Sequence, residues 1–344
     1  MMSNMSQMKV VSNWMDVESV PENYVFPSEK RPTVAVKTTI SVLDLATDDR
    51  TFLFQNILDI TRDLGFFQVI NHGVSKELIN KTMMVFKEFH AMSSEEKERE
   101  CSKDPNKSCK FYTSSVNYET EQAHSWRDVS QFDCHPLEKY IHFWPEKPLN
   151  FREVVGEYCI EMRKLACKIL EVISEGLGLG RDYFKSEMSE HSSLLVNHYP
   201  PCPNPSLTLG LFPHCDPNFI TILFQDINGL QVFKNGQWID VDPIDDALIV
   251  NFGYFLEIIS NGNFKATEHR VMTNTKTYRQ TLVYLVFPKN DATIEPAKNL
   301  INEVDPPQYR SINCKEFMGE YFYMPRDREV VIKYLTSTNL NESV

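Results

Sequence analysis

In the first half of the chain, apolar residues recur with the helical period of about 3.6. Three of these amphipathic segments follow residues whose side chains can cap a helix N-terminus: Asp48 or Asp49, Ser75 and Asn150. The pattern predicts three helices: 49–64, 75–89 and 150–175. Gly65 and Gly176 are placed to end the first and the last of them. The first half of the chain is therefore predicted to be largely helical.

From residue 194 onward the pattern changes to short apolar runs separated by turns that contain Asn and Gly. Asn235-Gly236, between two apolar runs, is the clearest hairpin signal. Eight strands are predicted: 194–198, 209–212, 220–225, 230–233, 237–241, 247–252, 270–273 and 281–286. Short strands at this spacing favour a jelly roll, also called a double-stranded β-helix. The predicted fold class is thus α+β, mainly β, with a jelly-roll core and N-terminal helices packed outside it.

The remaining segments are shorter or less regular. Strands are predicted at 40–45 and 66–70, and short helices at 93–96, 182–188, 255–260 and 314–323, the last closing over the pocket mouth. Residues 101–135 are predicted to be an irregular loop, of the kind that often carries specificity. Its aromatic residues either face a substrate or cover the edge of the barrel: Phe111, Tyr112, Tyr118 and Trp126.

These elements divide the chain into four parts. We expect an extended arm at 1–38 with one helical turn near Asp16, a helical region at 39–190, the jelly-roll core at 191–325 and a tail at 326–344. The helical region and the core are expected to pack as one domain.

Composition and charge argue against several classes of function. The 344 residues carry a net charge of −12 without any basic run, which argues against nucleic-acid binding. No apolar stretch approaches the roughly 18 residues of a membrane span. The eight cysteines show no C-x-x-C spacing, which indicates reduced thiols. We expect a cytoplasmic monomer that binds a small molecule, no nucleic acid and no membrane.

Three residues in the strand region suggest a metal site. His214 and Asp216 are two residues apart, so on a strand or its extended end they point the same way. His269 comes from a second strand-like segment. Two imidazoles and one carboxylate form the facial triad of non-haem Fe(II) oxygenases, which leaves coordination positions open. An isolated H-x-D pair occurs often by chance, so further residues are needed.

A second constellation lies downstream and upstream of the triad. Arg279 and Thr281 occur in RQTLVYLVF, where a guanidinium and a hydroxyl two residues apart can bind a carboxylate. Asn197 and Tyr199 in LLVNHYPPCP can add polar contacts. The sequence therefore predicts a carboxylate anchor near the metal. His72 in the turn Asn71-His72-Gly73 is interpreted as structural.

Several motifs occur together in this chain: ISVLDL (40–45), LGFFQVINHGV (64–74), VNHYPPCPNP (196–205), LGLFPHCDPNFITILFQD (209–226), GLQVF (229–233), the pair His269-Arg270 and Arg279-Gln280-Thr281. On these motifs the chain resembles the plant 2-oxoglutarate-dependent dioxygenases over roughly residues 35–325, with similarity to gibberellin 20-oxidases among them. The stretches SNWMDVESVPENYVFPSEKRP and HPLEKYIHFWPEKP look most similar to the hyoscyamine 6β-hydroxylase branch. The resemblance implies Fe(II) on His214, Asp216 and His269. It also implies 2-oxoglutarate on Arg279 and Thr281 beside Tyr199.

The implied activity consumes O2 and 2-oxoglutarate, releases succinate and CO2, and hydroxylates, epoxidises or desaturates a small specialised metabolite, with alkaloids among the candidates. Ascorbate is the expected reductant. Asp216 is retained, which argues against the halogenating relatives. Three positions depart from the family pattern: Thr281 for Ser, His198 within N-H-Y-P, and Tyr254 for Asp. The exchange at Thr281 keeps the hydroxyl, whereas His198 and Tyr254 are predicted to reshape a pocket wall. The alternative for Tyr254 is that its ring only packs on a neighbouring strand.

Other functions fit parts of the same pattern. These are a gibberellin or other hormone oxidase, a cupin-type isomerase, a zinc hydrolase and a non-catalytic binding protein. The predicted substrate contacts are Phe111, Tyr112, Tyr118, Glu119, Tyr254 and Tyr321. A cationic substrate would need an acid, with Glu119, Glu121 and Glu257 as candidates, and an anionic one would need Lys110 or Arg127.

Overall fold

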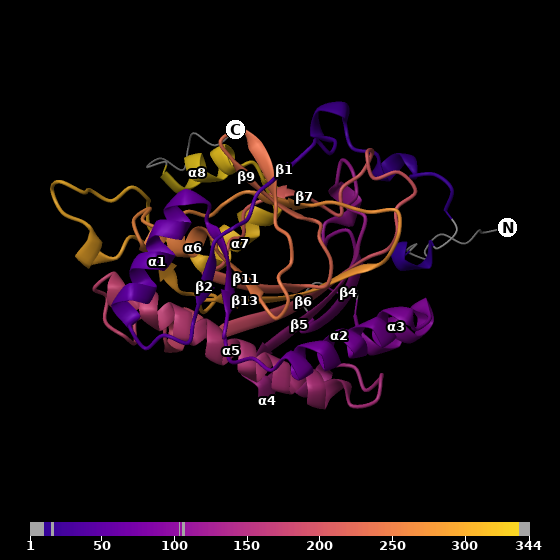
Figure 1. Cartoon of the computed structure of the whole chain (residues 1–344), viewed down its shortest axis with the longest axis horizontal. Helices are drawn as coiled ribbons and strands as arrows, with labels where there is room; N and C mark the ends of the chain where they lie inside the picture. Colours follow the sequence, from indigo (N-terminus) through magenta and orange to yellow (C-terminus); the bar gives the residue numbers. More distant parts are fainter. Residues whose placement is uncertain (1–9, 15–16, 103, 105–106, 337–344) are drawn as a thin grey trace.

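The computed structural model describes residues 10–14, 17–102, 104 and 107–336. A large and a small sheet face each other as the walls of a jelly roll, and the long helices cover the outer face of the large sheet (Figure 1). The large sheet runs in the order β2 (Val42–Asp44), β3 (Phe66–Ile70), β11 (Leu248–Phe252), β8 (Ile220–Gln225), β13 (Arg279–Phe287), β6 (His191–Tyr199), β5 (Asp128–His135) and β4 (Cys109–Thr113). The small sheet runs β1 (Val36–Lys37), β10 (Gln237–Asp240), β9 (Leu230–Lys234), β12 (His269–Val271) and β7 (Leu211–His214). A separate pair joins β14 (Thr293–Ile294) and β15 (Ile312–Asn313).

The eight strands predicted after residue 194 all form, with ends shifted by a few residues. The hairpin at Asn235-Gly236 joins β9 to β10 as expected. Both turn residues have positive φ, 49° and 79°. Asn and Gly are the residues that tolerate this left-handed geometry, which explains the strength of the signal.

The prediction of an irregular loop at 101–135 was wrong. Strands β4 and β5 lie within it, pair antiparallel and extend the large sheet beyond β6. Strand β5 was missed because polar residues stand at positions where a buried strand would normally be apolar, and two of these polar residues are buried. Asp128 accepts a hydrogen bond from the Thr113 hydroxyl at 2.6 Å, and Ser130 has no exposed surface.

The long helices are α1 (Arg50–Asp63), α2 (Lys76–Ala91) and α5 (Phe151–Gly176). Asp49 and Ser75 cap the first two as predicted, each accepting from a backbone N–H three residues on. Asn150 precedes α5 but makes no capping hydrogen bond. Gly176 was predicted to cap α5, but it is the last residue inside the helix and the cap is Leu177. A Cβ at position 176 would lie 2.0 Å from Cγ of Phe54, so close packing against that ring requires glycine here. The left-handed residue that follows the helix is Gly178 instead.

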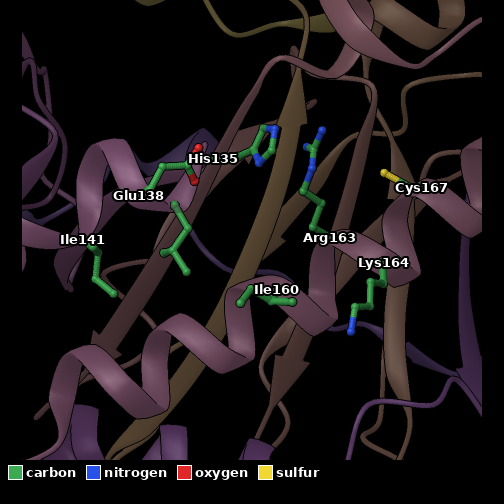
Figure 2. Close-up of a pocket in the computed structure, with 8 residues that line it drawn as sticks. His135, Glu138, Ile141, Ile160, Arg163, Lys164 and Cys167 are labelled. Atoms are coloured by element: carbon green, nitrogen blue, oxygen red, sulfur yellow. The ribbon is translucent and has the colours of Figure 1, made fainter.

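The shorter helices complete the covering layers. They are α3 (Ser94–Glu100), α4 (Leu137–Tyr140), α6 (Tyr254–Ile259), α7 (Cys314–Tyr323), α8 (Arg328–Thr336) and the 3-10 turns Val11–Asn13, Glu22–Tyr24, Ser28–Lys30, Tyr118–Thr120, Ile141–Phe143, Ser186–Ser189 and Lys298–Leu300. The short helix predicted at 182–188 is only a turn followed by the 3-10 turn at Ser186–Ser189. A hollow of about 580 Å³ lies between α4 and α5 on the outer surface (Figure 2). None of the predicted site residues lines it.

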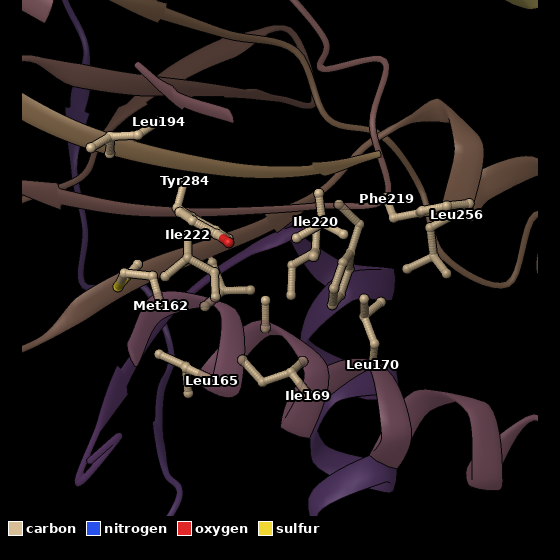
Figure 3. Close-up of a cluster of buried hydrophobic side chains, with 14 of the residues drawn as sticks. Met162, Leu165, Ile169, Leu170, Leu194, Phe219, Ile220, Ile222, Leu256 and Tyr284 are labelled. Carbon is tan, nitrogen blue, oxygen red and sulfur yellow. The ribbon is translucent and has the colours of Figure 1, made fainter. Parts of the chain in front are cut away.

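The main core lies between α5 and the large sheet (Figure 3). Met162, Leu165 and Ile169 point from the helix toward Ile222 and Tyr284 on β8 and β13. All of them are at most 3% exposed. Because strand residues alternate between faces, the even-numbered positions of β8 and β13 belong to this outer core. The odd-numbered positions face the small sheet, where the site forms.

The arm and the tail both pack on the body. The buried ring of Tyr24 meets Trp126 edge-on at 5.5 Å, and β1 pairs in parallel with β10. The helical turn predicted near Asp16 lies outside the described residues. The region predicted as a tail contains α8, whose Val331 and Leu335 are fully buried.

The helical region and the jelly roll share one body. Strands β2 to β5 come from residues before 190, yet they belong to the same sheet as β6, β8, β11 and β13. One hydrophobic cluster includes residues of both parts. No helix in the described part of the chain is both long and apolar enough to span a membrane.

Candidate active site

The three predicted metal ligands converge between the sheets. His214 ends β7, His269 opens β12, and the two are direct partners in the small sheet. Asp216 follows in the loop before β8. One ligand atom from each residue can be chosen so that all lie within 4.8 Å of one another. Nε2 of His214 and of His269 lie 3.6 and 3.7 Å from Oδ1 of Asp216. This spacing can accommodate one metal ion.

Hydrogen bonds fix which atom of each residue faces the common point. Nδ1 of His214 lies 3.0 Å from the Phe212 carbonyl oxygen, and Nδ1 of His269 lies 3.1 Å from that of Thr267. Each carbonyl accepts the Nδ1 proton, so both Nε2 atoms are free to bind a metal. Asp216 accepts through Oδ2 from Thr221 at 2.6 Å and Asn251 at 2.9 Å, which leaves Oδ1 for the metal.

The protonation states also suit a cation. Burial alone would raise the pKa of the Asp216 carboxyl, but His269, His214 and the Thr221 hydroxyl outweigh it, so this pKa lies below its usual value. Burial, with His214 alongside, lowers the pKa of His269 to about 4. At neutral pH the site therefore combines a carboxylate with a neutral imidazole, the forms that bind metals.

Arg279 offers an unoccupied donor to an anion. Its side chain is 1% exposed, Nε donates to the Ile227 carbonyl oxygen at 3.2 Å, and Nη2 donates to Oε1 of Gln225 at 2.8 Å. Nη1 is buried and has no hydrogen-bond partner among the described residues. A buried donor without a partner is costly, and a carboxylate would satisfy it. The far carboxylate of 2-oxoglutarate fits this requirement.

A hydrogen-bond chain orients the hydroxyl beside it. Arg127 donates from Nη1 to Oδ1 of Asn197 at 2.7 Å, and Nδ2 of Asn197 donates to Oγ1 of Thr281 at 3.1 Å. Because the Thr281 oxygen already accepts, its own proton is available for an anion. The guanidinium carbon of Arg279 lies 4.9 Å from the ring centroid of Tyr199. All four predicted anchor residues are thus brought together on β6 and β13.

We infer a space between the triad and this anchor from three partly exposed apolar residues on the inner face of the large sheet. Leu195, Leu223 and Val283 lie side by side in the register of β6, β8 and β13, on the face toward the small sheet. They remain partly exposed although their strands are central in the large sheet. Apolar residues in such a position are normally covered, so their exposure marks the interior of the site.

The predicted substrate contacts on β4 and in the loop after it are divided. Tyr112 faces the interior, where its hydroxyl donates to Oε1 of Gln131 at 3.2 Å. Tyr118 is partly exposed and stacks on His124 with 3.8 Å between the ring centroids, and Glu119 is exposed. Phe111 points to the opposite face and packs on Phe89 of α2. A substrate contact for Phe111 is therefore ruled out, because strand alternation sends neighbouring side chains to opposite faces.

Two departures from the family pattern also lie away from open space. His198 stacks on His90 at 4.6 Å on the outer face of the sheet, so the prediction that it shapes a pocket wall was wrong. Tyr254 is fully buried, and its ring meets those of Phe317 and Tyr321 on α7. Tyr254 packs, as the alternative interpretation held, but against helix α7 and not against a neighbouring strand. The Tyr321 hydroxyl donates to the carbonyl of Cys215, between two of the triad residues.

The sequence did not indicate the residues that orient the predicted ones: Thr221, Asn251, Gln225 and, as a partner of Asn197, Arg127. Thr221, Asn251 and Gln225 share one feature that the sequence does show. They are polar residues on otherwise apolar strands, at the alternate positions that face the small sheet. A buried polar residue needs a partner, so polar exceptions in apolar strands were the available clue.

Comparison with known proteins decides the family. A sequence model of the 2OG-Fe(II) oxygenase superfamily matches residues 190–288, and one described as "non-haem dioxygenase in morphine synthesis N-terminal" matches residues 40–147. Protein DOWNY MILDEW RESISTANCE 6 of Arabidopsis thaliana is 40% identical over 330 residues, covering 93% of this chain and 96% of the relative. The chain belongs to the 2OG-Fe(II) oxygenase superfamily. It is a 2-oxoglutarate-dependent dioxygenase that uses Fe(II), 2-oxoglutarate and O2.

Further members agree in sequence and in fold. Hyoscyamine 6-dioxygenase of Hyoscyamus niger is 40% identical over 336 residues, covering 94% of this chain and 97% of the relative. A crystal structure of JOX2 in complex with 2OG, Fe and JA superposes with a TM-score of 0.85 at 32% identity, covering 95% and 97% of the two chains. The predicted family, its jelly-roll fold and its iron and 2-oxoglutarate dependence are confirmed.

Proposed function

We propose that this dioxygenase oxidises a small specialised metabolite, by hydroxylation or desaturation at C–H bonds or by epoxidation. The observation that carries this proposal is the convergence of two donor sets on one interior space. The triad offers three ligand atoms at one point, and Arg279 offers a buried, unpartnered Nη1. The partly exposed apolar row of Leu195, Leu223 and Val283 borders the space.

Each residue would have a distinct task. His214, Asp216 and His269 would hold Fe(II), and Thr221 with Asn251 would keep Oδ1 of Asp216 toward it. Arg279 and Thr281 would bind the far carboxylate of 2-oxoglutarate beside Tyr199, with Asn197 orienting Thr281. When bound, iron and 2-oxoglutarate supply the oxidising chemistry, in which O2 is consumed, succinate and CO2 are released and the substrate is oxidised. The protein supplies binding, orientation and exclusion of water.

The chemical class of the substrate has support from named relatives only. The name hyoscyamine 6-dioxygenase supports an alkaloid, and the name flavanone 3-dioxygenase 2 of rice supports a phenolic compound. The JOX2 complex with JA supports a hormone oxidase as the second candidate. We also propose a monomer that works in the cytoplasm, in keeping with the free cysteines.

A metabolite screen tests the proposal. Purified protein is incubated with Fe(II), ascorbate, 2-oxoglutarate and fractionated plant extracts, and products are read as mass shifts together with succinate. We expect one class of compound to gain an oxygen atom or lose two hydrogen atoms, with equimolar succinate. The Asp216→Ala variant serves as the matched control and should give neither product. Succinate formation that is equal in the two proteins would contradict the proposal.

A further inference from the structure

Arg326 lies in the segment between α7 and α8, close to the triad. Its guanidinium carbon lies 4.5 Å from the ring centroid of Tyr321 and 5.6 Å from that of Phe212. The Phe212 ring is 6.0 Å from the ring of His214, and Tyr321 donates to the Cys215 carbonyl. A single layer of aromatic side chains thus separates this positive charge from the metal ligands.

Arg326 also lacks an acidic partner. No carboxylate in the described ranges lies within 4.0 Å of it, whereas its neighbour Arg328 forms two hydrogen bonds with Glu257, of 2.7 and 2.9 Å. The Arg326 side chain is partly buried. A guanidinium that lies on aromatic rings is weakly hydrated and held in one orientation, which prepares it to bind an anion bidentately.

The acids that could have received a cationic substrate are engaged or exposed. Glu257 binds Arg328 and Tyr309 and is 1% exposed. Glu121 accepts from the hydroxyls of Ser114 and Ser115 and bonds His124. Glu119 is exposed.

Positive groups are instead gathered on the interior wall. Lys110 on β4 pairs in register with Gln131, on the same face as Tyr112. Burial raises the pKa of the Tyr112 hydroxyl, the charges of Arg127 and Arg326 oppose that increase, and Glu121 adds to it. The protein as a whole carries a net charge of −12, so this local excess of positive charge stands out from the rest of the molecule.

We propose that Arg326 is a specificity-determining residue that binds a carboxylate of the primary substrate, so that the substrate is a small organic acid with an apolar body. The apolar body would lie between the metal ligands and Tyr112, beside Leu195 and outside the span from the triad to Arg279 that 2-oxoglutarate would take. This inference rests on the proposed function, because it assigns the substrate class of the same site. It favours acids over basic alkaloids.

Binding of matched probe pairs tests the inference without turnover. The pairs are benzoic, phenylacetic, 3-phenylpropanoic and decanoic acids, each with its neutral primary amide. Each probe is titrated anaerobically into the protein loaded with Fe(II) and 2-oxoglutarate, and binding is followed through the visible absorption of the metal complex and by calorimetry. At least one acid should bind about tenfold or more tightly than its amide, the value of one charge-assisted hydrogen bond.

Variants then separate recognition from packing. Arg326→Gln should weaken binding of that acid about tenfold or more and leave the affinity for its amide unchanged. Arg326→Lys should bind the acid with an affinity between those of wild type and Arg326→Gln. Arg310→Gln is the matched control, since Arg310 also lies over a tyrosine ring, 4.4 Å from the centroid of Tyr334. The inference is overturned if no acid exceeds its amide, or if Arg326→Gln weakens acid and amide alike. Failure of the proposed function would show differently, as absence of succinate formation in the screen.

Discussion

At the residue scale, the site depends on which atom of each side chain is free. Spacing made His214, Asp216 and His269 candidate metal ligands, and the resemblance to the dioxygenases turned the candidates into a predicted Fe(II) site. Spacing could not predict that Thr221 and Asn251 occupy one carboxylate oxygen of Asp216. Those partners come from strands five and thirty-five residues away, and only the sheet register brings them together.

The first prediction concerns the orientation of Asp216. Thr221→Val keeps the shape of the side chain but removes the hydrogen bond to Oδ2, so the carboxylate can rotate and should bind Fe(II) about tenfold more weakly. Calorimetric titration with Fe(II) measures the change. Thr208→Val is the matched control, because Thr208 is fully buried and its hydroxyl has no partner in the described structure. Equal affinities for Thr221→Val and wild type would show that this hydrogen bond does not orient the ligand.

The second prediction concerns the carboxylate anchor. Arg279→Lys should raise the KM for 2-oxoglutarate about tenfold or more, because an ammonium cannot supply Nη1 while keeping the bonds to Ile227 and Gln225. Thr281→Val should also raise it, whereas Thr281→Ser, the control that keeps the hydroxyl, should leave it nearly unchanged. Initial rates over a range of 2-oxoglutarate concentrations decide the matter, and an unchanged KM in Arg279→Lys would exclude this anchor.

At the element scale, helices and turns that follow local sequence rules could be predicted, whereas a strand with buried polar residues could not. The hairpin at Asn235-Gly236 and the cap at Asp49 follow local rules, and both form as predicted. Strand β5 escaped prediction because its buried Asp128 and Ser130 break the expected apolar alternation. Their burial depends on partners elsewhere in the chain, so no local pattern could reveal it.

The third prediction concerns the junction of β11 and α6. Gly253 packs against the loop that carries Asp216, where a Cβ would lie 2.3 Å from the Asn218 carbonyl oxygen and 2.6 Å from that of Asp216. These are backbone atoms, so Gly253→Ala must displace the loop. We expect weaker Fe(II) binding and a loss of stability of about 1–3 kcal/mol. Metal titration and urea unfolding measure the two effects.

Gly319→Ala provides the control for this junction, because Gly319 lies in α7 and a Cβ there meets nothing within 4 Å. An alanine in a helix is favoured over glycine by about 1 kcal/mol, so this variant should be at least as stable as wild type. If Gly253→Ala bound Fe(II) as tightly as Gly319→Ala, the junction would have no role in placing Asp216.

At the scale of the whole molecule, the N-terminal arm is tied to the body by contacts that are remote in sequence. Backbone N–H groups of Val11 and Ser12 donate to the two oxygens of Asp128 at 3.1 and 2.8 Å. More than a hundred residues separate these partners, so the polar composition of the arm predicted only an extended segment. Asp128 thus ties the docked arm to the edge of the large sheet, because it accepts both from the arm and from Thr113 on β4.

The last prediction tests whether Asp128 holds the N-terminal arm on the large sheet. Asp128 is fully buried and also accepts from the Thr113 hydroxyl, so Asp128→Ala leaves three donors without an acceptor. We expect a loss of about 3 kcal/mol in the free energy of unfolding, together with faster proteolysis within residues 10–38. Asp59→Ala, which removes an exposed carboxylate on α1, should change neither measurement. Urea unfolding and timed digestion with mass spectrometry give the two readouts. If stability fell while cleavage of the arm stayed as slow as in wild type, Asp128 would support the sheet alone, and the arm would be held by the aromatic contacts of Tyr24 instead.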